Sequence, residues 1–135
     1  MYNLLVIDDE VANAESLHRI LSRGGLGYSV EAYTQPREAL DRLRRGGVDL
    51  VLTDLRMDGM SGLELMETGK LLDPSIEFVL ITAYGTVDIA VEAMKKGASD
   101  FITKPLQRAA VLKTVEQALK RRQLVVENET LRARL

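Results

Sequence analysis

Short apolar runs rich in β-branched residues recur along the chain at regular spacing. They cover residues 4–7, 28–32, 48–53, 78–82 and 101–103. Each run has the length of a strand. The pattern therefore predicts five strands.

Between these runs, apolar residues return every three or four positions, which is typical of one face of a helix. Four such helices end at glycine or at an Asp-Pro pair, and a fifth begins after Pro105. The residues expected on the apolar faces are Val11, Ala14, Leu17, His18 and Leu21; Ala39, Leu40 and Leu43; Leu63, Leu65, Met66 and Leu72; and Val87, Ala90, Val91 and Met94.

Five strands that alternate with five helices indicate an α/β fold. Continuously apolar strands favour a parallel sheet with helices on both faces. With right-handed crossovers, the expected architecture is a doubly wound, flavodoxin-like sheet with strand order 2-1-3-4-5.

The fifth helix is too long for a domain of this size. Residues 106–135 contain neither glycine nor proline, and as one helix they would span about 45 Å. We expect a domain over residues 1–120 and a helical linker over residues 121–135. Because the pattern is unfinished at the last residue, we also expect the linker to lead into an effector domain.

Two apolar faces of different phase are predicted along this helix. The earlier face, with Leu112, Val115 and Leu119, is expected to pack on the sheet. The later residues follow a 4-3-4 spacing, which is typical of a coiled-coil seam with one polar position and favours a homodimer. A frayed polar helix is the alternative for this segment. The seam residues are Leu124, Asn128, Leu131 and Leu135.

Composition narrows the function. With 46% hydrophobic, 28% charged and only 4% aromatic residues, the core is aliphatic, and stacking on nucleic-acid bases is a poor candidate activity. The absence of cysteine excludes disulfides and thiol chemistry. No apolar run approaches the roughly 20 residues of a membrane span, and no signal peptide is visible. We expect a cytoplasmic protein without membrane contact.

Charge is distributed unevenly along the chain. Residues 1–106 hold 11 Lys and Arg against 17 Asp and Glu, whereas residues 107–135 hold 7 against 3. The acidic body and basic tail suggest two parts with different roles. The tail is not basic enough to predict direct contact with nucleic acid.

Polar side chains follow four of the predicted strands. Asp8 and Asp9 follow the first strand and Asp54 the third, Thr82 stands at the end of the fourth, and Lys104 follows the fifth. In a doubly wound parallel sheet, ligands bind beyond the carboxyl ends of the strands, so we expect these groups to converge. Taken singly, each has an ordinary interpretation as a cap, a turn residue or a solvated lysine.

Three converging carboxylates repel one another, and a hard divalent cation relieves that repulsion. Ligands that are all oxygen indicate Mg²⁺, for which Mn²⁺ can substitute. Lys104 and Thr82 supply the cation and the hydroxyl donor that a phosphoryl group needs. Because no Gly-rich phosphate loop is present, we expect Asp54 to accept the phosphoryl group directly as a nucleophile.

The motifs VIDDE, LTDLRM, ITA and ITKP, in this order, resemble the receiver domains of two-component response regulators. The resemblance covers residues 3 to about 120. The stretch ITAYGTVDIAVEAMKKGASDFITKP is most similar to NtrC-type receivers, which precede a sigma-54-dependent AAA+ ATPase and a DNA-binding domain. The resemblance thus implies a phosphoacceptor domain, with a sensor histidine kinase and its own effector domain as partners.

By resemblance, each site residue receives a role. Asp54 is the phosphorylated carboxylate. Asp9, Asp54 and the backbone carbonyl of Arg56 bind Mg²⁺ directly, and Asp8 binds it mostly through water. Lys104 pairs with the phosphoryl group.

The resemblance also implies a switch. Thr82 moves toward the phosphoryl group, and Phe101 turns inward into the space that Thr82 leaves. The Lys104–Pro105 bond is expected to be cis. Arg56 and Tyr84 lie two residues after Asp54 and Thr82, and their bulk is expected to slow hydrolysis.

The sequence departs from the family pattern at two positions. Asp58 replaces the usual proline four residues after Asp54, and it adds a charge near the site. Phe101 stands where many relatives have tyrosine, so the switch is expected to work by packing alone.

Two other classes of protein remain open on the residues alone. A Mg²⁺-dependent phosphohydrolase could use Asp54 as a turnover nucleophile, but such enzymes typically carry a second acid where this chain has Arg56. A flavin-binding electron carrier would need a phosphate-cradling loop where Asp8 and Asp9 stand. We therefore predict a domain that catalyses only its own phosphorylation and slow dephosphorylation, not a turnover enzyme.

Overall fold

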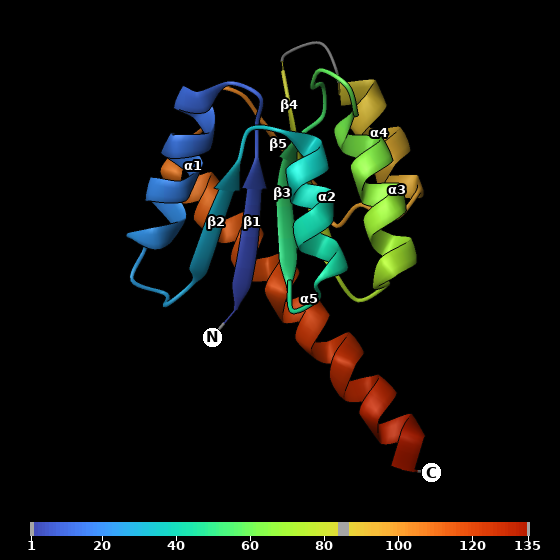
Figure 1. Cartoon of the computed structure of the whole chain (residues 1–135). Coiled ribbons are helices and arrows are strands. Elements are labelled where there is room, and N and C mark those ends of the chain that lie inside the picture. Colours follow the sequence, from blue (N-terminus) through green and yellow to red (C-terminus); the bar gives the residue numbers. More distant parts are fainter. Residues whose placement is uncertain (1, 84–86, 135) are drawn as a thin grey trace.

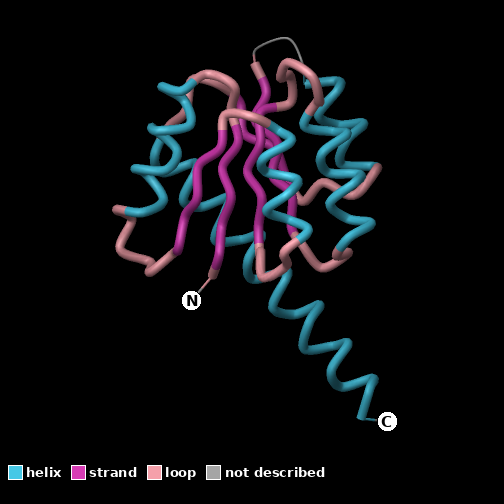
Figure 2. Tube along the Cα trace, viewed as in Figure 1, coloured by secondary structure: helices cyan, strands magenta, loops and turns pink. Residues whose placement is uncertain are grey.

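The computed structural model describes residues 2–83 and 87–134, and it confirms the predicted fold class. Over this range, β1 (Asn3–Ile7), β2 (Ser29–Tyr33), β3 (Leu50–Asp54), β4 (Glu77–Thr82) and β5 (Asp100–Thr103) form a parallel sheet in the order β2-β1-β3-β4-β5. The strands alternate with α1 (Val11–Ser22), α2 (Pro36–Arg44), α3 (Gly62–Leu72), α4 (Val87–Lys95) and α5 (Arg108–Arg134). Figure 2 shows the sheet as the middle layer between helices.

The two faces of the sheet carry separate hydrophobic cores, because side chains alternate along a strand. From β1, Leu5 and Ile7 contribute to the core beneath α2, α3 and α4. Leu4 and Val6 contribute to the core beneath α1 and α5. Figure 1 shows the same division of the helices. The central strands are therefore apolar on both faces, as the continuous runs predicted.

Strand boundaries differ from the predicted ones by one or two residues. The third apolar run begins at Val48, but β3 begins at Leu50. Val48 is nevertheless buried, because the loop that enters β3 packs against the core. Hydrophobicity alone does not distinguish a buried loop residue from the start of a strand.

Some residues predicted on the helix faces are exposed instead. The exposed fraction is 58% for Val11, 46% for Leu72, 43% for Val91 and 40% for Met94. Among the α4 side chains that the structure describes, Ala90 and Ala93 are buried, and the side chain of the predicted Val87 lies outside the described residues. The part of α4 that meets the core thus consists of small side chains, and its larger apolar residues lie outside the core.

Helix α5 packs on the sheet and then leaves it. Val115 and Leu119 are buried, as predicted, together with Val111 and Ala118. The helix then continues past the amino ends of the strands to Arg134, and it projects beyond the body of the molecule in Figure 1. In the described part of the chain, no helix is both long and apolar enough to cross a membrane.

Candidate functional site

The carboxyl ends of β1 and β3 bring three carboxylates together. Ile7 pairs with Thr53 in the parallel ladder, so the next residues, Asp8 after β1 and Asp54 at the end of β3, lie at the same level of the sheet. Carboxylate oxygens of Asp8, Asp9 and Asp54 lie within 4.8 Å of one another. Asp8 is completely buried, and Asp54 is 8% exposed.

Lys104 reaches the same cluster from the end of β5. Its Nζ lies 3.3 Å from Oδ2 of Asp54 and 3.6 Å from Oδ2 of Asp8. Its backbone amide donates to the carbonyl of Thr82 at 2.8 Å, which holds Lys104 next to the end of β4. The bond from Lys104 to Pro105 is cis, as expected. The structure thus unites all four predicted charged groups.

The cluster holds more negative than positive charge. Burial raises the pKa of the Asp8 carboxyl and the nearby Asp54 carboxylate raises it further, against the hydrogen bond from the Glu10 amide. Burial alone would lower the pKa of Lys104, but the carboxylates of Asp54 and Asp8 outweigh it and hold that pKa above its usual value. One ammonium among three carboxylates leaves a net negative site, which favours cations.

The donor set suits a hard divalent cation. Its ligands are all carboxylate oxygens, the type that Mg²⁺ and Mn²⁺ prefer. Oδ2 of Asp8 is buried and accepts no hydrogen bond within the described residues. The Lys104 ammonium lies 3.6 Å from this oxygen but offsets only one of the three carboxylate charges. The residues present therefore fit the expected metal.

Thr82 and Phe101 lie on neighbouring strands of the sheet. Thr82 ends β4 and is completely buried, yet its Oγ1 has no hydrogen-bond partner among the described residues. Phe101 is partly buried and packs against the core beneath α2, α3 and α4. Leu80 pairs with Phe101 in the ladder between β4 and β5, so both switch candidates belong to one pair of strands.

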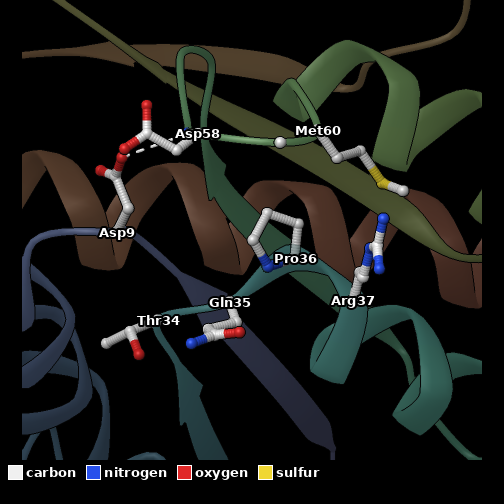
Figure 3. Close-up of a pocket in the computed structure, with 8 residues that line it drawn as sticks. Asp9, Thr34, Gln35, Pro36, Arg37, Asp58 and Met60 are labelled. Atoms are coloured by element: carbon white, nitrogen blue, oxygen red, sulfur yellow. Dashed lines mark hydrogen bonds between the residues drawn. The ribbon is translucent and has the colours of Figure 1, made fainter.

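The loop after β3 folds over the cluster. The backbone amide of Asp58 donates to Oδ2 of Asp9 at 3.3 Å (Figure 3), and Gly59 follows with a φ of +87° that favours glycine. Asp9 and Asp58 line a cleft of about 480 Å³. The other lining residues are Thr34, Gln35, Pro36, Arg37, Gly59 and Met60.

Gly62 is a site residue that the sequence pattern did not identify. A Cβ atom at this position would lie 2.3 Å from the backbone carbonyl oxygen of Asp54, so only glycine lets α3 begin this close to Asp54. The signal available in the sequence was the helix start SGLE, in which Oγ of Ser61 accepts from the Glu64 amide at 3.1 Å.

The other predicted residues, at the site and in the coiled-coil seam, are either exposed or outside the described residues. Arg56 is exposed on the loop after β3, and ligation of a metal by its carbonyl stays a prediction. Tyr84 lies outside the described residues. Leu124, at the start of the predicted seam, is 66% exposed, whereas the side chains of Leu131 and Leu135 lie outside the described part.

Comparison with known proteins places this arrangement in a family. The family model of the response regulator receiver domain matches residues 4–116 of the chain. The transcriptional regulatory protein ZraR of Escherichia coli (strain K12) is 39% identical over 117 residues, which cover 87% of this chain and 26% of ZraR. The chain thus spans about a quarter of the length of such curated relatives.

Solved structures of proteins with response regulator receiver domains have the same fold as this chain. A response regulator receiver domain protein from Clostridium thermocellum superposes with a TM-score of 0.86 at 27% identity, covering 93% of this chain and 99% of that one. NtrX from Brucella abortus, solved in complex with ADP, gives a TM-score of 0.90 at 30% identity, covering 97% of this chain and 30% of NtrX. The predicted resemblance to receivers of larger transcriptional regulators is confirmed, and the chain belongs to the response regulator receiver domain family.

Proposed function

We propose that this chain is the phosphoacceptor part of a two-component response regulator, in which Asp54 takes a phosphoryl group from the phosphohistidine of a sensor kinase. The observation that supports this most strongly is the meeting of Asp54 with two further carboxylates and an ammonium at the carboxyl edge of the sheet. No simpler role requires all four charged groups in one place.

In the proposed reaction, a carboxylate oxygen of Asp54 attacks phosphorus, and the bond from phosphorus to the histidine nitrogen breaks. The imidazole leaves, and an acyl phosphate remains on Asp54. Lys104, 3.3 Å from Asp54, is placed to pair with a phosphoryl oxygen. Asp8, Asp9, Asp54 and the Arg56 carbonyl would hold Mg²⁺, which neutralises charge during transfer.

We propose that the phosphoryl group acts as a switch through Thr82. Its buried hydroxyl has no partner among the described residues, so a new acceptor on Asp54 gives it a bond that it lacks. Movement of Thr82 opens space that Phe101 can fill, because both lie on adjacent strands. The surface formed by α4, β5 and α5 changes as a result.

Helix α5 offers a route for the signal to leave the domain. It continues unbroken from residue 108 to residue 134, across the proposed boundary between the domain (1–120) and the linker (121–135). We propose that the linker forms a homodimeric coiled coil and leads to an AAA+ ATPase and a DNA-binding domain of the sigma-54-dependent kind, in the cytoplasm. The exposed Leu124 supports a partner for the linker.

We further propose that Arg56 and Tyr84 slow hydrolysis of the acyl phosphate by restricting the approach of water. Replacement of each by alanine is expected to speed dephosphorylation. Unchanged rates in both variants would contradict this role.

The proposed function is tested by intact mass after incubation with acetyl phosphate and Mg²⁺. We expect one added phosphoryl group that hydroxylamine removes and that Asp54→Asn lacks. Asp41→Asn, which removes an exposed carboxylate on α2, serves as the matched control and should still be modified. If Mg²⁺ binds but no adduct forms, the phosphoacceptor role is wrong. Release of phosphate from small phosphomonoesters would instead favour a hydrolase.

A further inference from the structure

Asp58 lies at the tip of a short closed loop beside the metal cluster. The loop is fixed at its base, where the Gly62 amide donates to the carbonyl of Leu55 at 2.9 Å. At its tip the Asp58 amide donates to Oδ2 of Asp9 at 3.3 Å. The base and the tip of the loop are therefore both held, and Asp58 stays next to Asp9, a predicted ligand of the metal.

The carboxylate of Asp58 is close to the cluster but does not belong to it. Only Asp8, Asp9 and Asp54, among the described residues, have carboxylate oxygens within 4.8 Å of one another. In Figure 3 the Asp58 carboxylate points toward that of Asp9, at the wall of the open cleft. This position suits contact with a metal-bound water better than contact with the metal.

We propose that Asp58 is an outer-sphere residue of the metal site, which accepts a hydrogen bond from a water on the divalent cation; this proposal rests on the proposed function. Mg²⁺ keeps several waters in proteins, and the cleft beside Asp9 gives them room. The buried Oδ2 of Asp8 accepts no hydrogen bond among the described residues. The Lys104 ammonium, 3.6 Å away, offsets only one of the three carboxylate charges, so the cluster still favours a divalent cation. Asp58, which stands where the family usually has proline, thus contributes to metal affinity.

Elementary electrostatics sets the size of the effect. A carboxylate that contacts a divalent cation through one water lies roughly 5 Å from it, and in water the attraction corresponds to about tenfold in affinity. At physiological ionic strength, screening reduces this to about threefold. The contribution of Asp58 should therefore depend on salt, unlike that of the buried Asp8.

The experiment is titration of the whole chain with Mg²⁺ by calorimetry, at low salt and at physiological ionic strength. Asp58→Asn removes the charge but keeps the backbone amide, and we expect it to weaken binding about tenfold at low salt and about threefold at high salt. Asp58→Glu keeps the charge and is expected to bind within about twofold of the wild type. Circular dichroism checks that each variant is folded.

Asp41→Asn is the matched control, because it removes the same charge from an exposed position on α2. Equal affinities for Asp58→Asn and Asp41→Asn would overturn the proposal while leaving the phosphoacceptor role intact. Failure of the wild type itself to bind Mg²⁺ would instead overturn both this proposal and the metal site on which it rests. The two failures are thus distinguishable.

Discussion

Arg122, in the part of α5 that leaves the sheet, forms an ion pair with Asp49 just before β3. The distance from Nη2 to Oδ1 is 3.2 Å, and the two side chains are only 16% and 20% exposed. The other carboxylate oxygen of Asp49 accepts a hydrogen bond from the backbone amide of Asn3 at 2.7 Å. One residue earlier, Arg121 donates to the carbonyl of Ser99 at 3.1 Å. The outgoing helix is therefore fastened to the edge of the sheet opposite Asp54.

The first prediction concerns this ion pair. Arg122→Gln and Asp49→Asn should each lower the free energy of unfolding by about 1–2 kcal/mol, because each leaves a half-buried charge unpaired. The double variant should lose about 1 kcal/mol less than the sum of the single losses. Denaturant unfolding measures all four proteins. Full additivity would show that the pair contributes no coupling energy.

The second prediction concerns Gly62. Gly62→Ala should destabilise the domain by about 3 kcal/mol, because a Cβ would meet the backbone oxygen of Asp54 at 2.3 Å and neither backbone can yield easily. Gly24→Ala is the control: its Cβ would meet the flexible end of Leu112 at 2.9 Å, so a loss of less than about 1 kcal/mol is expected. Thermal unfolding compares the two, and equal losses would refute the proposed backbone clash.

The third prediction concerns the buried hydroxyl of Thr82. Thr82→Val has nearly the same shape but lacks the unpartnered oxygen, so the unphosphorylated domain should become about 1 kcal/mol more stable, or stay unchanged. The switch should nevertheless fail, because valine cannot bond a phosphoryl oxygen. Hydrogen exchange of β5 and α5, before and after phosphorylation, measures this. A phosphorylation-dependent change that survives in Thr82→Val would argue against the switch role.

The fourth prediction concerns pH. The Asp8 pKa is raised above its usual value of 3.8, so the folded state binds this proton more tightly than the unfolded state does. The free energy of unfolding of the metal-free domain should therefore fall as pH rises from about 4 through the raised pKa. Asp8→Asn should remove that fall and be more stable than the wild type at neutral pH.

The control for this prediction is Mg²⁺ itself. Millimolar Mg²⁺ should raise the melting temperature of the wild type at neutral pH, because it binds only the folded state, and it should have a smaller effect on Asp8→Asn. A wild type whose stability responds neither to pH in the acid range nor to Mg²⁺ would contradict the electrostatic account.

Local pattern was sufficient to predict the elements and their order. Apolar runs, glycine stops and polar residues after each run all depend on neighbours in sequence, and they predicted five strands, five helices and the parallel sheet. They also identified Asp8, Asp54, Thr82 and Lys104, because in a parallel sheet every strand delivers its carboxyl end to the same edge.

Tertiary structure decided what depends on distance between remote segments. Gly62 beside Asp54, Asp58 on Asp9 and Arg122 on Asp49 are contacts that no spacing in the sequence indicates. The exposure of Val91 and Met94 is of the same kind, since the helix buries Ala90 and Ala93 instead. Residue type and periodicity thus determined which functional side chains lie together at the carboxyl edge of the sheet. Packing between segments determined how closely each backbone approaches, and so which side chains remain free to act.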